Sequence, residues 1–165
     1  MYRKTFEGQN CSIARALDEV GEWWSLLIVR ECTLGTARFD DFQRRLGIAR
    51  NVLTARLARL VEVGVIEKVP AAGSETRNEY RLTEKGEELY PVLVALLQWG
   101  DRWCGHEPPV TVVDIRTGRP VDDVALRMGQ RKLGLRDVRL EPGPGATEQT
   151  QAVLEARNLV ILGNP

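Results

Sequence analysis

Residues 50–64 of this 165-residue chain read RNVLTARLARLVEVG, and this stretch decides the fold. Its apolar residues Leu53, Leu57, Leu60 and Val61 recur at helical spacing and predict one buried stripe. The opposite side carries two small alanines between polar residues, a slim face of the kind that fits a groove about as wide as a helix. The stretch is therefore interpreted as a recognition helix for DNA, with an ordinary amphipathic surface helix as the alternative.

The overall composition is that of a globular chain, with 28% charged and 43% hydrophobic residues. The longest apolar run, residues 92–97, is far shorter than the roughly 20 residues of a membrane span. Residues 1–11 contain no apolar core of a signal peptide, and three cysteines without framework spacing favour a reducing compartment. We therefore expect a cytoplasmic protein that does not bind a membrane.

Positive charge is concentrated around the opening stretch, although the whole chain has a net charge of zero. Residues 36–61 contain six arginines and two acidic residues, a local net charge of +4. Such a patch is sufficient for contacts with phosphates. The neutral total favours the alternative of a protein-interaction module that does not bind DNA.

Helical spacing predicts three further helices before the opening stretch, at residues 11–20, 22–34 and 39–46. The last of these is short, and the turn at residues 47–49 leads from it directly into residue 50. A short helix, a tight turn containing glycine and a second helix with polar outer residues form the helix-turn-helix pattern.

After Gly64 the periodicity changes to that of strands. Residues 65–69 and 78–82 are expected to be strands, because turn-forming residues separate them. A hairpin directly after a helix-turn-helix is a wing. Polar residues at its tip suit a phosphate or the edge of a minor groove: Ser74, Thr76 and Arg77.

A long helix capped by Thr83 is expected to run roughly to Trp103. Its apolar residues cover more than one face, whereas a surface helix needs a single stripe. The excess predicts a partner, and symmetric homodimers are the commonest oligomers. The alternative is that the C-terminal tail covers this surface. The residues predicted at the dimer interface are Leu89, Leu93, Leu96, Leu97 and Trp99.

Five short motifs follow one another from Cys11 to about Trp103: CSIARAL at 11–17, FDDF at 39–42, NVLT at 51–54, YRLT at 80–83 with Gly86, and WG at 99–100. In order and spacing, these residues resemble the HxlR-type family of bacterial winged helix-turn-helix transcriptional regulators. The resemblance implies a homodimeric regulator that binds DNA, built around the first and last helices of the winged domain. Some members respond to redox or electrophilic signals.

The function predicted is that of a sequence-specific regulator, a repressor, whose two recognition helices enter successive major grooves of a palindromic operator roughly 34 Å apart. Asn51 and Thr54 are expected at base edges, and the arginines at phosphates or guanine. Arg56 has an alternative role, which is to brace a carboxylate within the domain. The full set of predicted DNA-binding residues is Arg38, Arg50, Asn51, Thr54, Arg56, Arg59 and Arg77.

Cys11 is the sharpest chemical candidate, because the positive end of a helix dipole and nearby Arg15 favour a thiolate. In some members of the family that the chain resembles, a cysteine at this position senses an oxidant or electrophile. The alternatives are a small packing residue and, less favoured, the nucleophile of a redox enzyme. A single histidine, His106, supports neither a metal cluster nor a Ser/His/Asp triad, so no enzymatic activity, metal or cofactor is expected.

From Glu107 the composition shifts, and residues 110–115, 121–126 and 135–140 are expected to be strands. Thr147 opens a last amphipathic helix.

The prediction is therefore an α+β chain. Its winged helix-turn-helix domain, a helical core plus a β-hairpin wing, occupies residues 1–105. A small β-rich extension ending in a helix occupies residues 106–165. Longer members of the family that the chain resembles often carry cysteine pairs with the appearance of metal ligands, but this chain has no cysteine after Cys104. The extension is expected to support the structure or the dimer, with a pocket for a small-molecule effector as the alternative.

Overall fold

The computed structural model describes residues 6–73, 76–105 and 107–162, and its contacts divide the chain into two compact units. One unit, here called the winged unit, spans residues 16–123. The other joins the described residues up to Arg15 to those from Val124 onward. This division differs from the predicted boundary between residues 105 and 106.

The winged unit continues past residue 105 because two contacts fasten the following segment to the helix at Tyr90–Trp103. Arg102 Nη2 lies 3.1 Å from Asp123 Oδ2, and Gln98 Nε2 donates to the carbonyl of Asp122 at 3.2 Å.

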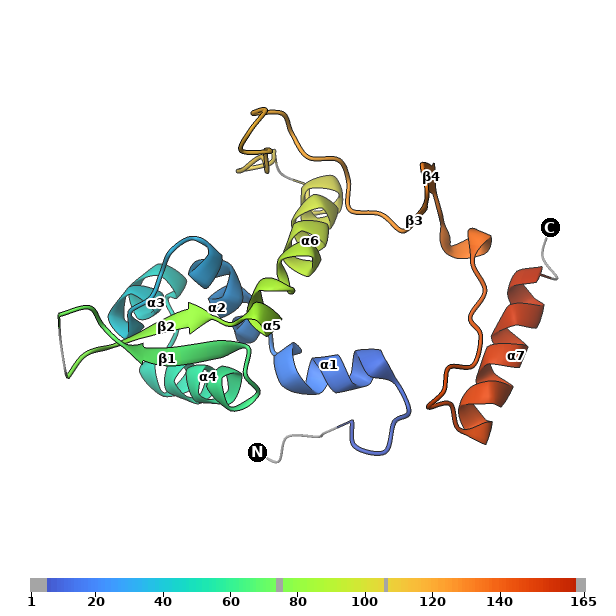
Figure 1. Cartoon of the computed structure of the whole chain (residues 1–165), viewed down its shortest axis with the longest axis horizontal. Coiled ribbons are helices and arrows are strands. Elements are labelled where there is room, and N and C mark those ends of the chain that lie inside the picture. The colour runs from blue at the N-terminus through green and yellow to red at the C-terminus, as the bar shows by residue number, and fades with distance from the viewer. Residues whose placement is uncertain (1–5, 74–75, 106, 163–165) are drawn as a thin grey trace. The chain divides into compact units, whose positions relative to one another are not determined.

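Among the described residues, four helices come before the two strands of the wing. Figure 1 labels these elements in chain order. Gly47, in the left-handed conformation at φ 63°, ends the third helix and starts the tight turn into the fourth. The predicted helix-turn-helix followed by a hairpin is therefore confirmed. In order, the elements are α1 (Ser12–Val20), α2 (Trp23–Thr33), α3 (Phe39–Leu46), α4 (Arg50–Glu62), β1 (Ile66–Pro70), β2 (Asn78–Leu82), α5 (Glu84–Glu87) and α6 (Tyr90–Trp103).

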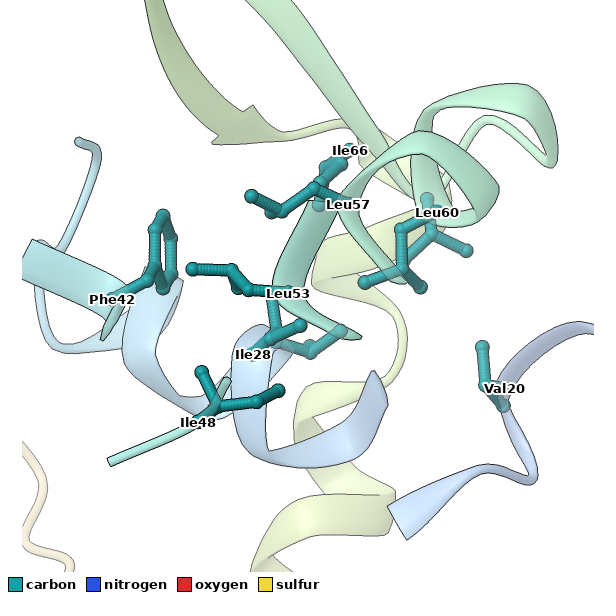
Figure 2. Packing of buried hydrophobic residues seen from close by; sticks show 10 residues of the cluster. Val20, Ile28, Phe42, Ile48, Leu53, Leu57, Leu60 and Ile66 are labelled. Atoms are coloured by element: carbon teal, nitrogen blue, oxygen red, sulfur yellow. The ribbon is translucent and has the colours of Figure 1, made fainter. Parts of the chain in front are cut away.

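The core of the winged unit is built on the predicted stripe of α4. Leu53, Leu57 and Leu60 are fully buried, and Figure 2 shows Ile28 of α2 and Phe42 of α3 in the same cluster. Burying a side chain of this size contributes about 1.5–3 kcal/mol. Because these side chains anchor one face of α4, the opposite face is held toward solvent.

The wing is an antiparallel pair in which Ile66 lies opposite Leu82 and Pro70 opposite Asn78. The connector between α2 and α3 joins it, since the amide of Tyr80 donates to the carbonyl of Ala37 at 2.8 Å. The ring of Tyr80 also meets that of Phe42 edge to face, with centroids 6.3 Å apart. Both contacts fasten the wing to the helix-turn-helix.

The Leu-Thr-x-x-Gly motif at residues 82–86 closes the base of the wing. The hydroxyl of Thr83 accepts from the amide of Gly86 at 3.2 Å and donates to the carbonyl of Gly64 at 2.6 Å. A Cβ on Gly86 would lie 2.1 Å from the carbonyl oxygen of Val65. Thr83 thus caps α5, and Gly86 permits the close approach of α5 to the chain before β1.

The single helix predicted from Thr83 to Trp103 is wrong in one respect, because α5 ends at Glu87 and α6 begins at Tyr90. Pro91 follows the break. Proline has no amide proton, so Pro91 cannot donate the hydrogen bond to the carbonyl of Glu87 that a continuous helix would contain.

The β-rich extension is also a prediction that needs correction. Residues 110–115, 121–126 and 135–140 are not strands, and the first of these segments makes only an isolated bridge between Val113 and Pro120. Alternation of apolar residues does not make a strand without a neighbouring chain to pair with. The regular elements of this region are β3 (Arg127–Met128), β4 (Arg131–Lys132), the 3₁₀ turn at Leu135–Asp137 and α7 (Glu148–Leu162).

The predicted terminal helix is confirmed as α7. Thr147 caps it, because its hydroxyl accepts from the amide of Thr150 at 3.2 Å.

Candidate nucleic-acid interface

The outer face of α4 is slim and polar, as the sequence predicts. Asn51, Thr54, Ala55 and Ala58 are all exposed. The side-chain amide of Asn51 makes no hydrogen bond with the described residues, so its NH₂ donors and its oxygen acceptor are available. The hydroxyl of Thr54 donates to the carbonyl of Arg50 at 2.9 Å and keeps its oxygen as an acceptor.

The N-terminal end of α4 is open to an anion. Its N-cap residue, Ala49, offers no side-chain acceptor to the first amides of the helix. Arg50, the first residue of α4, is 71% exposed, and its guanidinium carbon lies 4.8 Å from the centre of the Phe39 ring. Its Nη1 lies 3.8 Å from Asp40 Oδ1. Free amides and a cation at one helix end form an arrangement that suits a phosphate.

Two of the predicted DNA contacts, Arg56 and Arg59, are largely covered. Arg56 is 24% exposed, and its Nη2 lies 3.3 Å from Glu22 Oε2, just before α2. Arg59 is 31% exposed, and its Nη1 lies 2.9 Å from Glu62 Oε2. For Arg56 this geometry is the bracing of a carboxylate within the domain, the alternative that the sequence left open.

Arg38 and Arg77 both lie next to β2 of the wing and are exposed. Arg38 Nε lies 3.8 Å from Glu79 Oε1 on β2, which places the start of α3 next to the wing. The carbonyl of Arg77 accepts from the amide of Ala71 at 2.8 Å and closes the described part of the tip. Ser74 lies outside the described residues.

A buried carboxylate that the sequence did not reveal connects α2 to α3. Glu31 of α2 accepts hydrogen bonds from Arg45 of α3, from Arg30 at 2.6 Å and from the hydroxyl of Thr36 at 3.2 Å. Burial opposes ionisation of Glu31, but these hydrogen bonds together outweigh it and hold the pKa of the carboxyl below its ordinary value. The available signal was a charged residue inside an apolar helix.

Glu31→Gln is expected to destabilise the winged unit by about 1–3 kcal/mol at pH 7, because it removes the acceptor charge shared by Arg45 and Arg30. The folded pKa is lowered, so the stabilisation is complete above the ordinary value of 4.5 and is lost as the pH falls through the folded pKa. The difference in unfolding free energy between wild type and variant should therefore shrink below about pH 4.5, as measured by urea denaturation.

Glu62→Gln is the matched control for Glu31, since it removes an exposed carboxylate paired with a single arginine. Its effect is expected to stay within about 0.5 kcal/mol. Equal losses from the two substitutions would contradict the role given to Glu31.

The predicted dimer residues separate into two groups. Leu89 and Leu93 pack against the core of their own unit, and Leu97 is half-buried. Leu96 and Trp99 are 50% and 60% exposed. Together with two further exposed residues, they form a stripe at spacings of four, three and four residues, here called the α6 stripe: Val92, Leu96, Trp99 and Trp103.

The cysteines differ in exposure. Cys11 is exposed and lies just before α1, and the guanidinium of Arg15 donates to the hydroxyl of Ser12 at 2.7 Å. Burial raises the pKa of Cys32 to about 12, and the charge of Glu31 adds to the shift. A thiol with so high a pKa is protonated at neutral pH and unreactive.

Within the described residues, no cluster of three or more His, Cys, Asp or Glu side chains could hold a metal ion. The turn at Asp114 is held by hydrogen bonds instead, since Oδ1 accepts from the amides of Thr117 at 2.7 Å and Arg116 at 3.1 Å. These bonds lower the pKa of Asp114. The helices of the same described part are too short or too polar to cross a membrane.

Comparisons with known proteins agree with this architecture. The model of the HxlR-like helix-turn-helix family matches residues 19–108. An uncharacterised HTH-type transcriptional regulator of Mycobacterium tuberculosis is 42% identical over 144 residues, covering 85% of this chain and 89% of the relative.

Two solved structures share the fold. The crystal structure of PA1607, a candidate transcription factor, is 42% identical with a TM-score of 0.76, covering 85% of this chain and 100% of that one. The reduced form of the transcriptional regulator YodB from B. subtilis is 26% identical with a TM-score of 0.50, covering 59% of this chain and 97% of that one.

A helix-turn-helix with a fastened hairpin and an exposed polar second helix defines a winged-helix transcriptional regulator, not an enzyme. The chain belongs to the HxlR-like helix-turn-helix family.

Proposed function

We propose that this regulator binds a palindromic DNA operator as a homodimer and represses transcription from it. The observation that carries the proposal is the outer face of α4, where Asn51, Thr54 and two alanines are exposed opposite a fully buried leucine stripe. A slim polar helix face is what a major groove admits. The open amides beside Arg50 add a position for a backbone phosphate.

The residues predicted to contact DNA differ in exposure, and their proposed roles follow from it. Asn51 and Thr54 read base edges, and Arg50, Arg38 and Arg77 hold phosphates around them. Arg59 reaches a phosphate only if its guanidinium leaves Glu62, so its contribution is smaller. Arg56 acts through Glu22 and positions α4 against α2.

The proposed dimer forms through the α6 stripe of each subunit. Spacings of four, three and four residues place Val92, Leu96, Trp99 and Trp103 on one side of the helix, as in the seam between packed helices. On α1, Leu17 is also exposed. A two-fold dimer would bury the stripe and Leu17 and present two α4 helices to successive grooves.

A response to an oxidant or electrophile through Cys11 is part of the proposal, supported by the exposure of the thiol. The structural relative YodB was solved in a reduced form. If wild type and Cys11→Ser respond identically to hydrogen peroxide in DNA-binding assays, sensing by Cys11 is excluded while DNA binding stands.

Asn51→Ala tests sequence reading by α4. Duplexes selected by the wild-type protein from a random library supply the probe for mobility-shift titrations. The variant should bind this duplex more weakly by about 1–3 kcal/mol and tolerate substitution at one base pair of the site.

Gln151→Ala is the matched control, because it removes an exposed side-chain amide from α7 instead of α4. It should leave affinity and selectivity unchanged. Failure of the wild type to enrich any duplex would favour the protein-interaction module instead.

A further inference from the structure

A second concentration of positive charge lies outside the winged unit. Residues 124–140, here called the basic segment, contain five basic residues and one acidic residue, a local net charge of +4. This equals the local charge of residues 36–61, on a chain whose total charge is zero. The winged-helix fold does not account for it.

The basic segment is organised as a minimal hairpin. Arg127 lies opposite Lys132 and Met128 opposite Arg131, and Gly129 adopts φ 59° in the two-residue turn. The amide of Leu133 donates to the carbonyl of Leu126 at 2.8 Å and adds one more bond to the ladder.

This hairpin places like charges directly across from each other. Opposed like charges destabilise an antiparallel pair, and an isolated two-stranded hairpin is marginally stable even without them. Arg127 and Lys132 share a face of the hairpin, both exposed. The hairpin therefore presents two basic side chains on one face, and the guanidinium of Arg127 is accessible to an anion there.

Local acids neutralise the segment only in part. Arg139 Nε lies 2.6 Å from Glu141 Oε1, and Arg131 Nη1 lies 3.7 Å from Asp137 Oδ1. Arg127 and Arg136 are exposed and form no ion pair with the described residues. Two guanidinium groups are thus available without breaking an internal contact.

The composition of the segment selects the kind of polyanion. Four of its five basic residues are arginine, whose planar guanidinium matches phosphate geometry. It contains no Phe, Tyr or Trp, so it has no platform on which unpaired bases stack and no aromatic anchor for a membrane interface. These features favour the phosphate backbone of a duplex.

We propose that the basic segment is a second DNA contact, which binds backbone phosphates of duplex DNA without reading sequence. The contact adds to the proposed operator binding by α4 and rests on that function. It increases affinity for any duplex, whereas α4 supplies the selectivity.

Salt dependence tests this contact, because the slope of log affinity against log salt counts the phosphates that a protein neutralises. The probe is a labelled mixed-sequence duplex of about 50 base pairs, titrated with full-length protein in KCl from about 50 to 200 mM. The double variant Arg127→Gln/Arg136→Gln should show a slope that is shallower by about 1.8, which corresponds to two phosphates at about 0.9 each.

Two further variants separate charge at this position from other effects. Arg116→Gln/Arg119→Gln removes the same charge from exposed positions outside the segment and should leave the wild-type slope. Arg127→Lys/Arg136→Lys keeps the charge and should also keep the slope. A lysine variant that loses as much slope as the glutamine variant would overturn the proposal.

The remaining outcomes are distinct. A wild-type slope in the glutamine variant overturns the second contact, and if Asn51→Ala still loses selectivity, the proposed function survives. If the wild type binds no duplex, both proposals fail. Loss of binding to anionic vesicles of phosphatidylcholine and phosphatidylserine by the glutamine variant, with unchanged DNA slope, would assign the segment to a membrane.

Discussion

Gly86→Ala is expected to destabilise the winged unit by more than about 3 kcal/mol, at or beyond the upper end of what overpacking costs in protein cores. The added Cβ would lie 2.1 Å from the carbonyl oxygen of Val65 and 3.0 Å from Leu82 Cδ2. The first of these neighbours is backbone. It cannot move without disturbing the hydrogen bonds that the Val65 carbonyl accepts from the amide of Thr83 at 3.2 Å and from its hydroxyl at 3.1 Å.

Urea denaturation followed by circular dichroism measures this loss. Gly143→Ala is the matched control, since a Cβ there meets no atom within 4 Å. That substitution should change stability by no more than about 0.5 kcal/mol. A variant at Gly86 as stable as this control would show that α5 can withdraw from the wing at little cost.

Trp99→Asp is expected to convert the proposed dimer into a monomer at micromolar concentration and to weaken operator binding by about 100-fold or more. Trp99 lies in the middle of the α6 stripe, and burial of a new carboxylate in an apolar contact is strongly unfavourable. The loss of operator affinity is large because two unlinked subunits bind the two half-sites independently.

Sedimentation equilibrium and mobility shift measure the two effects. Ile115→Asp introduces the same charge at a residue that is 97% exposed, and it should change neither the oligomeric state nor the affinity. A Trp99→Asp protein that remains dimeric would exclude the α6 stripe as the interface.

Local periodicity predicted the helices and the wing well, because burial of one face repeats at the spacing of the element. Leu53, Leu57 and Leu60 place α4 correctly for this reason. The pairing of Arg56 with Glu22, 34 positions earlier, could only be named as an alternative, since contacts between distant residues depend on the tertiary fold. The extra role of Glu31 was missed for the same reason.

The C-terminal tail shows that alternation of apolar residues is not sufficient to predict a strand. Residues 110–115 alternate as a strand should, yet no described strand pairs with them beyond one bridge. Alternation reports which face a segment could bury, and the neighbour that completes a sheet is a separate requirement. The residues proposed to contact DNA stay predictions for a similar reason, because their partner is a separate molecule that the periodicity of this chain does not describe.

The bond between the amide of Tyr80 and the carbonyl of Ala37 has a consequence for control. With the ring contact to Phe42, it fastens the wing to the helix-turn-helix at two points. An effector of the proposed dimer would therefore gain little by moving the wing alone. It would act by changing the distance between the two winged units, so that their α4 helices fit or miss grooves one helical turn apart.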